Sequence, residues 1–281
     1  MSTVYTFLNQ DFVPSDKACL HISDLAFQRG YGIFDFFRVM EGYPLFIDDY
    51  LKRFYGSATE MQLEVPYTQE KLKEIIFELI RRNDLPMSGL KLMLTGGYSP
   101  DAFHITQPNL VITQQPLSLS QDPVLPKGIK IITHAYVRDS PRVKTINYIT
   151  GIWLQNKISK QGASDVLYHQ GGEVSELPRC NFFIVKPDKT LVTPSKNILY
   201  GITRQHVLEL AAKKFNVQEG VVTLQDVMEA QEAFLTSTTK RILPITHVDN
   251  HLIGTGEPGA VAQQLYMDLI QLEKEELAGI R

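Results

Sequence analysis

The chain has 281 residues, of which 43% are hydrophobic and 21% are charged, a composition typical of a globular protein with a sizeable core. Its 28 lysine and arginine residues and 31 aspartate and glutamate residues give a net charge of −3, which argues against a nucleic-acid-binding protein that acts through bulk positive charge. The moderate glycine and proline content and the many aliphatic residues exclude collagen-like and disordered classes.

Cysteine and histidine usage bears on compartment and metal binding. Cys19 and Cys180 are too few for a disulfide framework or a metal cluster, and the seven histidines do not fall in metal-ligand spacings. No apolar run approaches the roughly 18 residues that span a bilayer. The opening residues lack a basic region followed by an apolar stretch, so we expect no signal peptide. These features predict a cytoplasmic protein without a metal, a membrane partner or a nucleic-acid partner.

The first part of the chain alternates short strands with one clear helix. Alternating apolar and polar residues predict strands at residues 4–8, 34–40, 90–95 and 109–113. Thr68 is positioned to cap a helix over residues 68–82, where leucine and isoleucine recur on one face.

A proline-containing stretch separates this part from the rest. Residues 114–128 contain three prolines and show no clear period. We therefore expect a linker at 116–126 between a small domain at 1–115 and a larger domain at 127–281.

The second part contains a predicted strand, two hairpins and two helices. In chain order these cover residues 129–133, 166–169 with 173–176, 182–185 with 190–193, 204–215 and 258–275. Gly171-Gly172 suits the turn of the first hairpin. The order is too irregular for a simple doubly wound sheet, so we predict a mixed α/β (α+β) chain of two unequal domains.

Several common enzyme motifs are absent, and an ordered set of short motifs takes their place. The sequence has no HExxH, Walker, GxSxG or GxGxxG motif. The set comprises YGIFD at 31–35, YLKRFYGSA at 50–58, RVKTINY at 142–148, GEVSE at 172–176, NFFIV at 181–185 and LYGITR at 199–204.

This set resembles the class IV (fold type IV) pyridoxal-phosphate aminotransferases over about residues 20–245. The family includes D-amino-acid aminotransferases, branched-chain aminotransferases and aminodeoxychorismate lyase. The resemblance implies a small α/β domain with a larger pseudo-barrel domain, and a homodimer whose sites lie between the domains at the dimer interface. It also implies pyridoxal 5'-phosphate as cofactor, with an amino acid and a 2-oxo acid as small-molecule partners.

Two residues match the catalytic centre of that family. A pyridoxal enzyme needs an amine that forms a Schiff base and later moves the α-proton, and Lys144 matches this lysine. A carboxylate beside the ring nitrogen raises the pKa of that nitrogen and keeps it protonated. Glu176 matches that carboxylate, whereas its neighbour Glu173 lies at the Gly-Gly turn, where we expect it to face solvent.

The resemblance also implies contacts to the phosphate and the ring. Phosphates are bound by arginine, hydroxyls and the free N–H groups of a helix start, here a helix that we expect to begin near Arg204. The implied cofactor contacts, besides the catalytic pair, are Arg53, Ile202, Thr203, Ser237 and Thr238 at the phosphate, Leu199 against the ring face and Tyr148 near the ring hydroxyl.

The substrate-binding motifs depart from those of the best-known members. Many D-amino-acid enzymes carry Arg-x-His after a Ser-Pro pair, whereas here Asp101-Ala102-Phe103 follows Ser99-Pro100. Branched-chain members carry Tyr-x-Arg on the preceding strand, which here reads Leu90-Lys91-Leu92. An α-carboxylate needs a positive partner, so the candidate substrate contacts are Arg29, Lys91 and Arg179, with Phe34 beside them.

The sequence predicts a pyridoxal-phosphate transaminase, with D-amino acids favoured over L-amino acids. The alternatives are a branched-chain L-amino-acid aminotransferase and a lyase on the same scaffold. Aminodeoxychorismate lyase typically has a small hydroxyl residue after the strand aromatic, where this chain reads Phe34-Asp35-Phe36, and the lyase is therefore less favoured. The presence of Lys144 and Glu176 argues against a non-catalytic protein that has only kept the fold.

Overall fold

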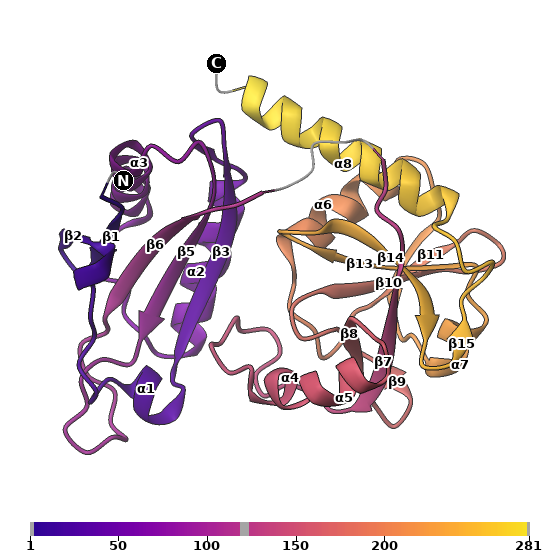
Figure 1. Cartoon of the computed structure of the whole chain (residues 1–281), viewed down its shortest axis with the longest axis horizontal. Coiled ribbons are helices and arrows are strands. Elements are labelled where there is room, and N and C mark those ends of the chain that lie inside the picture. Colours follow the sequence, from indigo (N-terminus) through magenta and orange to yellow (C-terminus); the bar gives the residue numbers. More distant parts are fainter. Residues whose placement is uncertain (1–2, 119–123, 280–281) are drawn as a thin grey trace. The chain divides into compact units, whose positions relative to one another are not determined.

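The computed structural model describes residues 3–118 and 124–279. Within them the chain forms two compact units (Figure 1). The first contains residues 3–118, Val143–Asn147 and residues 276–279, and the second contains residues 124–142 and Tyr148–Glu275. Residues 119–123, inside the predicted linker 116–126, lie outside the described residues.

The first unit is built on an antiparallel sheet. Its described residues form six strands in the order β2-β1-β6-β5-β3-β4. The strands are β1 (Tyr5–Leu8), β2 (Asp11–Pro14), β3 (Gly32–Met40), β4 (Tyr43–Pro44), β5 (Met87–Thr95) and β6 (Leu110–Pro116). A 3₁₀ helix and three α-helices complete the unit: η1 (Ser15–Lys17), α1 (Leu25–Arg29), α2 (Ile47–Glu60) and α3 (Gln69–Asn83). The strands and the helix predicted here from sequence are confirmed.

Helices α2 and α3 pack against one face of this sheet (Figure 1). The ring of Phe37 on β3 lies 5.3 Å from that of Tyr50 on α2, and both side chains are buried. Thr68 caps α3 as predicted, because its hydroxyl accepts a hydrogen bond from the N–H of Lys71 at 3.3 Å. Residues that alternate along β3 therefore face either these helices or the opposite side of the sheet.

A short segment from the second half of the chain adds to the free edge of β3. Thr145 pairs with Ile33 in an antiparallel bridge. The N–H of Phe34 donates to the carbonyl of Lys144 at 2.9 Å, and the N–H of Ile146 donates to that of Gly32 at 3.1 Å. Backbone hydrogen bonds of this kind fix the segment against the strand, so Lys144 belongs structurally to the first unit.

The second unit contains a larger mixed sheet that curls (Figure 1). Nine strands of the described residues follow the order β12-β11-β10-β13-β14-β7-β8-β9, with β15 beside β14. The strands are β7 (Ile129–Ala135), β8 (Asp165–Gln170), β9 (Glu173–Val174), β10 (Asn181–Val185), β11 (Leu191–Pro194), β12 (Val217–Gly220), β13 (Glu232–Ser237), β14 (Arg241–Val248) and β15 (His251–Leu252). The helices are α4 (Ile149–Trp153), α5 (Gln155–Lys160), α6 (Ile202–Ala211), α7 (Leu224–Met228) and α8 (Ala260–Ala278). Both predicted hairpins are confirmed, as β8–β9 and β10–β11.

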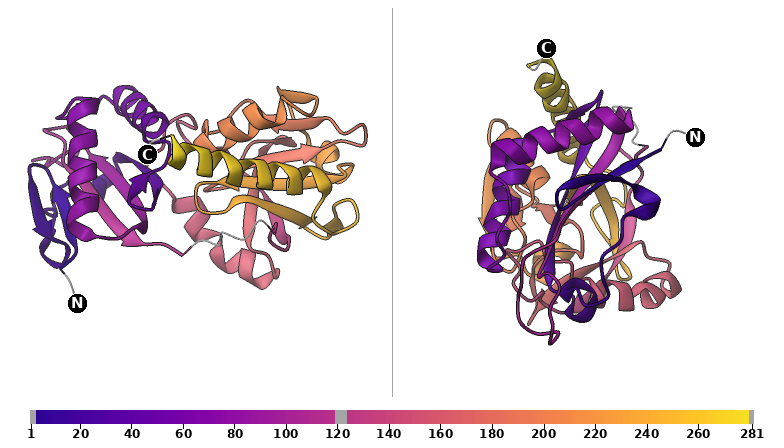
Figure 2. Two further views of the ribbon diagram at one scale, coloured as in Figure 1. Left: turned by 90° about the horizontal axis from the view of Figure 1, so that it is seen from above. Right: turned by 90° about the vertical axis from the view of Figure 1, so that its left-hand side faces the viewer.

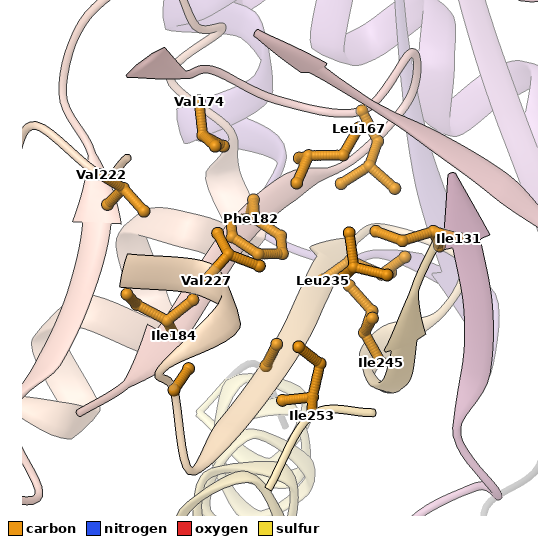
Figure 3. Packing of buried hydrophobic residues seen from close by; sticks show 14 of the residues in the cluster. Ile131, Leu167, Val174, Phe182, Ile184, Val222, Val227, Leu235, Ile245 and Ile253 are labelled. Atoms are coloured by element: carbon orange, nitrogen blue, oxygen red, sulfur yellow. The ribbon is translucent and has the colours of Figure 1, made fainter. Parts of the chain in front are cut away.

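Alternating side chains of β10 and β13 form two cores on opposite faces of this sheet. Phe182 and Leu235 belong to the cluster drawn in Figure 3, which is buried beside α7. Phe183 and Phe234 stack at 5.1 Å on the other face. That face is covered by α6 and by α8, which lies along the second unit in Figure 2. Burial on both faces explains why these strands read as continuous apolar runs in the sequence.

A buried ion pair fastens α8 to the sheet of the second unit. Arg241 on β14 donates from Nε to Glu273 Oε2 at 2.9 Å and from Nη2 to the same oxygen at 2.8 Å. The two side chains are 4% and 2% exposed. Burial removes water from both charges, and each charge compensates the other for this loss of solvation.

Removing one member of this pair should destabilise the protein. In Glu273→Gln, Arg241 stays buried without a carboxylate, so we expect the free energy of unfolding in urea to fall by about 3 kcal/mol. Glu275→Gln, on an exposed part of the same helix, is the control and should change it by less than about 0.5 kcal/mol. An E273Q variant as stable as the parent would contradict this role for the pair.

Candidate functional site

Two predicted site residues, Lys144 and Lys91, lie beside the ring of a third, Phe34, in the first unit. Nζ of Lys144 lies 4.7 Å from the centroid of this ring, and Nζ of Lys91 lies 5.1 Å from it. At these distances an ammonium group is attracted by the negative face of the ring. The sum of the two distances limits the separation of the two nitrogens to about 10 Å. The structure thus brings together three of the residues that the sequence singled out.

Lys91 is a half-buried lysine in the middle of β5. Burial lowers the pKa of this amine from its ordinary value, because the charged form loses solvation. A lysine in such a position holds its proton less firmly than an exposed one, so its charge depends on what lies beside it.

Arg53 lies on α2 and is bound by a carboxylate that was not singled out from the sequence. Its Nε donates to Asp35 Oδ2 at 2.9 Å and its Nη2 donates to Oδ1 at 2.6 Å. Such a two-point contact fixes the plane of the guanidinium. Asp35 sits on the buried face of β3, 1% exposed, and a carboxylate within an apolar strand was itself a signal that a cation would lie nearby.

In the second unit, the buried carboxylate of Glu176 is fixed by two partners. Arg138, which follows β7, donates from Nε to Oε1 at 2.8 Å, and its Nη2 lies 2.7 Å from the same oxygen. The N–H of Leu199 donates to Oε2 at 2.9 Å. The glutamate side chain is 5% exposed. The guanidinium stabilises the ionised carboxylate, and the backbone bond fixes its orientation.

The first hairpin of the second unit explains why Glu176, and not Glu173, is the buried carboxylate. Gly171 and Gly172 both have positive φ, as a two-residue hairpin turn requires. Beyond β9 the pairing continues, because the N–H of Tyr168 on β8 donates to the carbonyl of Glu176 at 2.9 Å. Glu173 lies next to the turn and is exposed, as expected from sequence.

Asn181 connects Leu199 to the start of α6. Its Nδ2 donates to the carbonyl of Leu199 at 2.7 Å. A Cβ at Gly201 would lie 2.1 Å from Asn181 Oδ1, so this contact requires glycine. Gly201 is the N-cap of α6 and makes no side-chain capping bond. The N–H groups of Ile202 and Thr203 therefore open the helix without a side-chain cap, two residues earlier than the predicted start near Arg204.

The remaining predicted cofactor residues lie at the ends of other elements of the second unit. Ser237 ends β13, and Thr238 follows it. Thr236, the residue before them, is paired with Asn181 on β10, and its buried hydroxyl has no hydrogen-bond partner. Tyr148 is the N-cap residue of α4. Ser237 and Thr238 thus lie at the end of β13, next to the residue that pairs with Asn181.

Two other predicted substrate cations, Arg29 and Arg179, are exposed at the surface. Arg29 ends α1 and is exposed, with Nη1 donating to the carbonyl of Gln28 at 2.8 Å. Arg179 is an exposed turn residue of the second unit.

The sequence did not predict the contact of Arg138 with Glu176 or that of Asn181 with Leu199. Arg138 follows β7, and β7 pairs in parallel with β8. The carboxyl end of β7 therefore meets the strand that leads through the hairpin to Glu176. An arginine three residues after the end of a largely apolar strand was the available signal. Asn181 opens the buried strand β10, where a polar side chain is expected to find a specific partner.

Among the residues that the structure describes, no group of three or more side chains is arranged to hold a metal ion. None of the helices in that part of the chain is long and apolar enough to cross a membrane.

Comparison with known proteins connects this arrangement to one family. The family model "Amino-transferase class IV" matches residues 32–248. A D-alanine aminotransferase of Listeria monocytogenes is 29% identical over 272 residues, which cover 94% of each chain. A putative branched-chain-amino-acid aminotransferase of Methanocaldococcus jannaschii is 29% identical over 273 residues, covering 92% of this chain and 93% of the relative. The crystal structure of a branched-chain amino acid aminotransferase from Thermobaculum terrenum in its PLP-form superposes with a TM-score of 0.86 at 22% identity, covering 98% of this chain and 95% of the other.

A double-mutant cycle should reveal the coupling between Arg138 and Glu176. Arg138→Met leaves a buried carboxylate without its cation, so we expect a loss of about 3 kcal/mol in unfolding free energy in urea. Glu176→Gln in the same chain removes that charge, and the double variant should lose about 2 kcal/mol less than the two single losses together. The exposed pair Lys71–Glu74 is the control, and the losses of its two single variants should be close to additive. Additive losses at residues 138 and 176 would contradict the coupling.

Proposed function

Because the chain belongs to the class IV aminotransferase family, we propose that it moves an amino group between an amino acid, preferably a D-amino acid, and a 2-oxo acid, with pyridoxal 5'-phosphate as cofactor. The resemblance read from the ordered motifs is thereby confirmed at the level of the family. The predicted fold class is confirmed by the superposition on a class IV enzyme. The observation that carries the proposal is the buried Glu176 carboxylate, held by Arg138 and by the N–H of Leu199.

The second unit has the features that the ring and the phosphate of this cofactor require. Glu176 is buried, oriented and stabilised as an anion, which suits a group that holds a proton on the ring nitrogen. Ile202 and Thr203 offer uncapped N–H groups at the start of α6, which suit a phosphate. Ser237 and Thr238 add hydroxyls for the phosphate, and we assign Leu199 to the ring face and Tyr148 to the ring hydroxyl.

The first unit supplies the amine. When bound, pyridoxal phosphate would supply a sink for the electron pair released as the α-proton of the amino acid leaves. Nζ of Lys144 would take that proton from the α-carbon and pass it on rather than back to the same carbon, which separates amino-group transfer from racemisation. The backbone hydrogen bonds of residues 144 and 146 to β3 hold the lysine segment in place. The ring face of Phe34 lies against this amine and restricts where the amine can move. Arg53, oriented by Asp35, contributes a positive charge to phosphate binding.

Substrate recognition rests on cations that face the α-carboxylate. Lys91 shares the ring of Phe34 with Lys144, so a carboxylate bound by Lys91 lies near the reacting amine. Arg29 and Arg179 are both exposed in the structure. We assign them as further contacts to this carboxylate or to a side-chain carboxylate, with Arg29 on a loop that we expect to reach the site of the partner subunit. We also infer a homodimer with its site at the subunit interface, and a cytoplasmic location that agrees with the sparse cysteines.

The preference for D-amino acids is supported by the D-alanine aminotransferase of Listeria monocytogenes. It is also supported by Lys91, which stands on the strand where branched-chain enzymes carry Tyr-x-Arg. The branched-chain alternative is favoured by a different observation, the similarity to the relative from Methanocaldococcus jannaschii.

Visible absorbance of the cofactor-saturated protein tests the proposal. We expect an absorbance band that disappears when D-alanine is added without an acceptor, and that returns when 2-oxoglutarate is added. Lys144→Ala should lower turnover by about 10³-fold, because a positioned general base contributes about 10²–10⁴-fold. Lys157→Ala, at an exposed lysine of α5, is the matched control and should behave like the parent.

Other responses would replace the proposal. A band that responds only to L-leucine or L-valine would assign the chain to the branched-chain enzymes. Release of pyruvate without any acceptor would assign it to the lyases. A cofactor-loaded protein whose band responds to no amino acid would contradict enzymatic function altogether.

Substrate binding through Lys91 should depend on pH in a defined direction. Because burial lowers the pKa of Lys91 below the ordinary 10.5, the ammonium is lost at lower pH than for an exposed lysine. We therefore expect KM for the amino acid to rise as the pH increases through that lowered pKa. Lys91→Met should raise KM at neutral pH by about tenfold or more and should remove this pH dependence. Lys91→Arg, which stays charged, should keep KM low at high pH, and a KM unaffected by K91M would contradict the role.

A further inference from the structure

We propose that the ring of Phe36 limits the size of the substrate side chain, by filling the space over Gly89 on the neighbouring strand. The inference rests on the proposed function, because it assigns the amino-acid substrate to the sheet face that carries the Lys144 amine. If the Phe36 ring limits the space in this way, the enzyme prefers amino acids with short side chains.

Phe36 lies on the same face of the sheet as Phe34. The two residues are two positions apart on β3, and such residues point to the same side of a strand. Asp35 and Phe37 point to the other side, where they meet Arg53 and Tyr50 of α2. Phe34 and Phe36 are half-buried, whereas Asp35 and Phe37 are fully buried. The face of Phe36 is therefore the one opposite the helices.

The ring of Phe36 takes the place that a side chain at residue 89 would occupy. A Cβ built at Gly89 would lie 2.2 Å from Cζ of Phe36 and 2.7 Å from its Cε2, far inside van der Waals contact. On β5, Gly89 is opposite Arg38, and Lys91 is opposite Phe36. The ring therefore leans diagonally across the strand pair, a direction in which aromatic side chains reach their neighbours.

The residues of this face follow one another in a fixed order. Nζ of Lys144 and Nζ of Lys91 both meet the ring of Phe34. Phe36 comes next, about 7 Å along the strand, with Lys91 as its cross-strand partner. An amino acid that reacts at Lys144 and binds Lys91 through its carboxylate thus has its side chain within reach of the Phe36 ring, and each added methylene meets that ring.

Phe36→Ala should widen the acceptance of larger substrates. With alanine, norvaline and leucine of whichever enantiomer turns over, we expect kcat/KM for leucine relative to alanine to rise by at least about tenfold, the effect of one methylene in an apolar pocket. The change should lie in KM more than in kcat, because the contact binds the ground state and the transition state alike. Phe77→Ala is the matched control, because it removes a ring from α3 of the same unit. Its ratio of kcat/KM for leucine to that for alanine should equal that of the parent.

Gly89→Ala tests whether the effect acts through the ring. Its methyl group must displace the far end of the Phe36 ring, which narrows the site. We therefore expect kcat/KM for leucine to fall below that of the parent enzyme. Thermal unfolding should show that the variant is folded. Adding Phe36→Ala to Gly89→Ala should abolish that fall. Unchanged selectivity in F36A, with an active parent enzyme, would overturn this inference alone. A parent that turns over no amino acid would overturn the proposed function and this inference with it.

Discussion

A buried carboxylate persists only beside a fixed positive partner, and the second unit is organised around one such contact. Arg138 holds Glu176 from one side, and the N–H of Leu199 holds it from the other. The carbonyl of Leu199 is in turn bound by Asn181, whose side chain also touches Gly201 at the start of α6. A continuous series of contacts therefore runs from the anion that we assign to the ring nitrogen to the N–H groups that we assign to the phosphate.

The first unit repeats the same principle with a different pair. Asp35 is buried on the helix-covered face of β3 and is neutralised by Arg53. The N–H of the preceding residue, Phe34, binds the carbonyl of Lys144. One strand thus orients a cation on one face and places an amine over an aromatic ring on the other. Because both functions use adjacent residues of β3, a shift of register by one residue would exchange the two faces and remove both.

The sequence predicted what depends on local periodicity and on ordered motifs. The helix capped by Thr68 and the hairpin that carries Glu176 could be predicted because their signals lie within a few residues of each other. The pairing of Thr145 with Ile33 could not be predicted, since it joins segments that are distant in the chain. The contact of Arg138 with Glu176 could not be predicted for the same reason, because it depends on the parallel pairing of β7 with β8. The diagonal contact of Phe36 with Gly89 depends on strand register, which no local pattern encodes.

With a lysine at residue 91, the positive charge on the Phe34 face of β3 and β5 depends on what surrounds the amine. An arginine there would stay charged whatever surrounded it, whereas burial lowers the pKa of Lys91. Binding of a carboxylate restores the solvation that the ammonium lost and favours its charged form. A bound carboxylate would therefore stabilise the charged form of Lys91, whose Nζ, like that of Lys144, lies near the ring of Phe34. In the proposal made above, charge, aromatic surface and limited space act together to favour a small molecule with a carboxylate and a short apolar side chain.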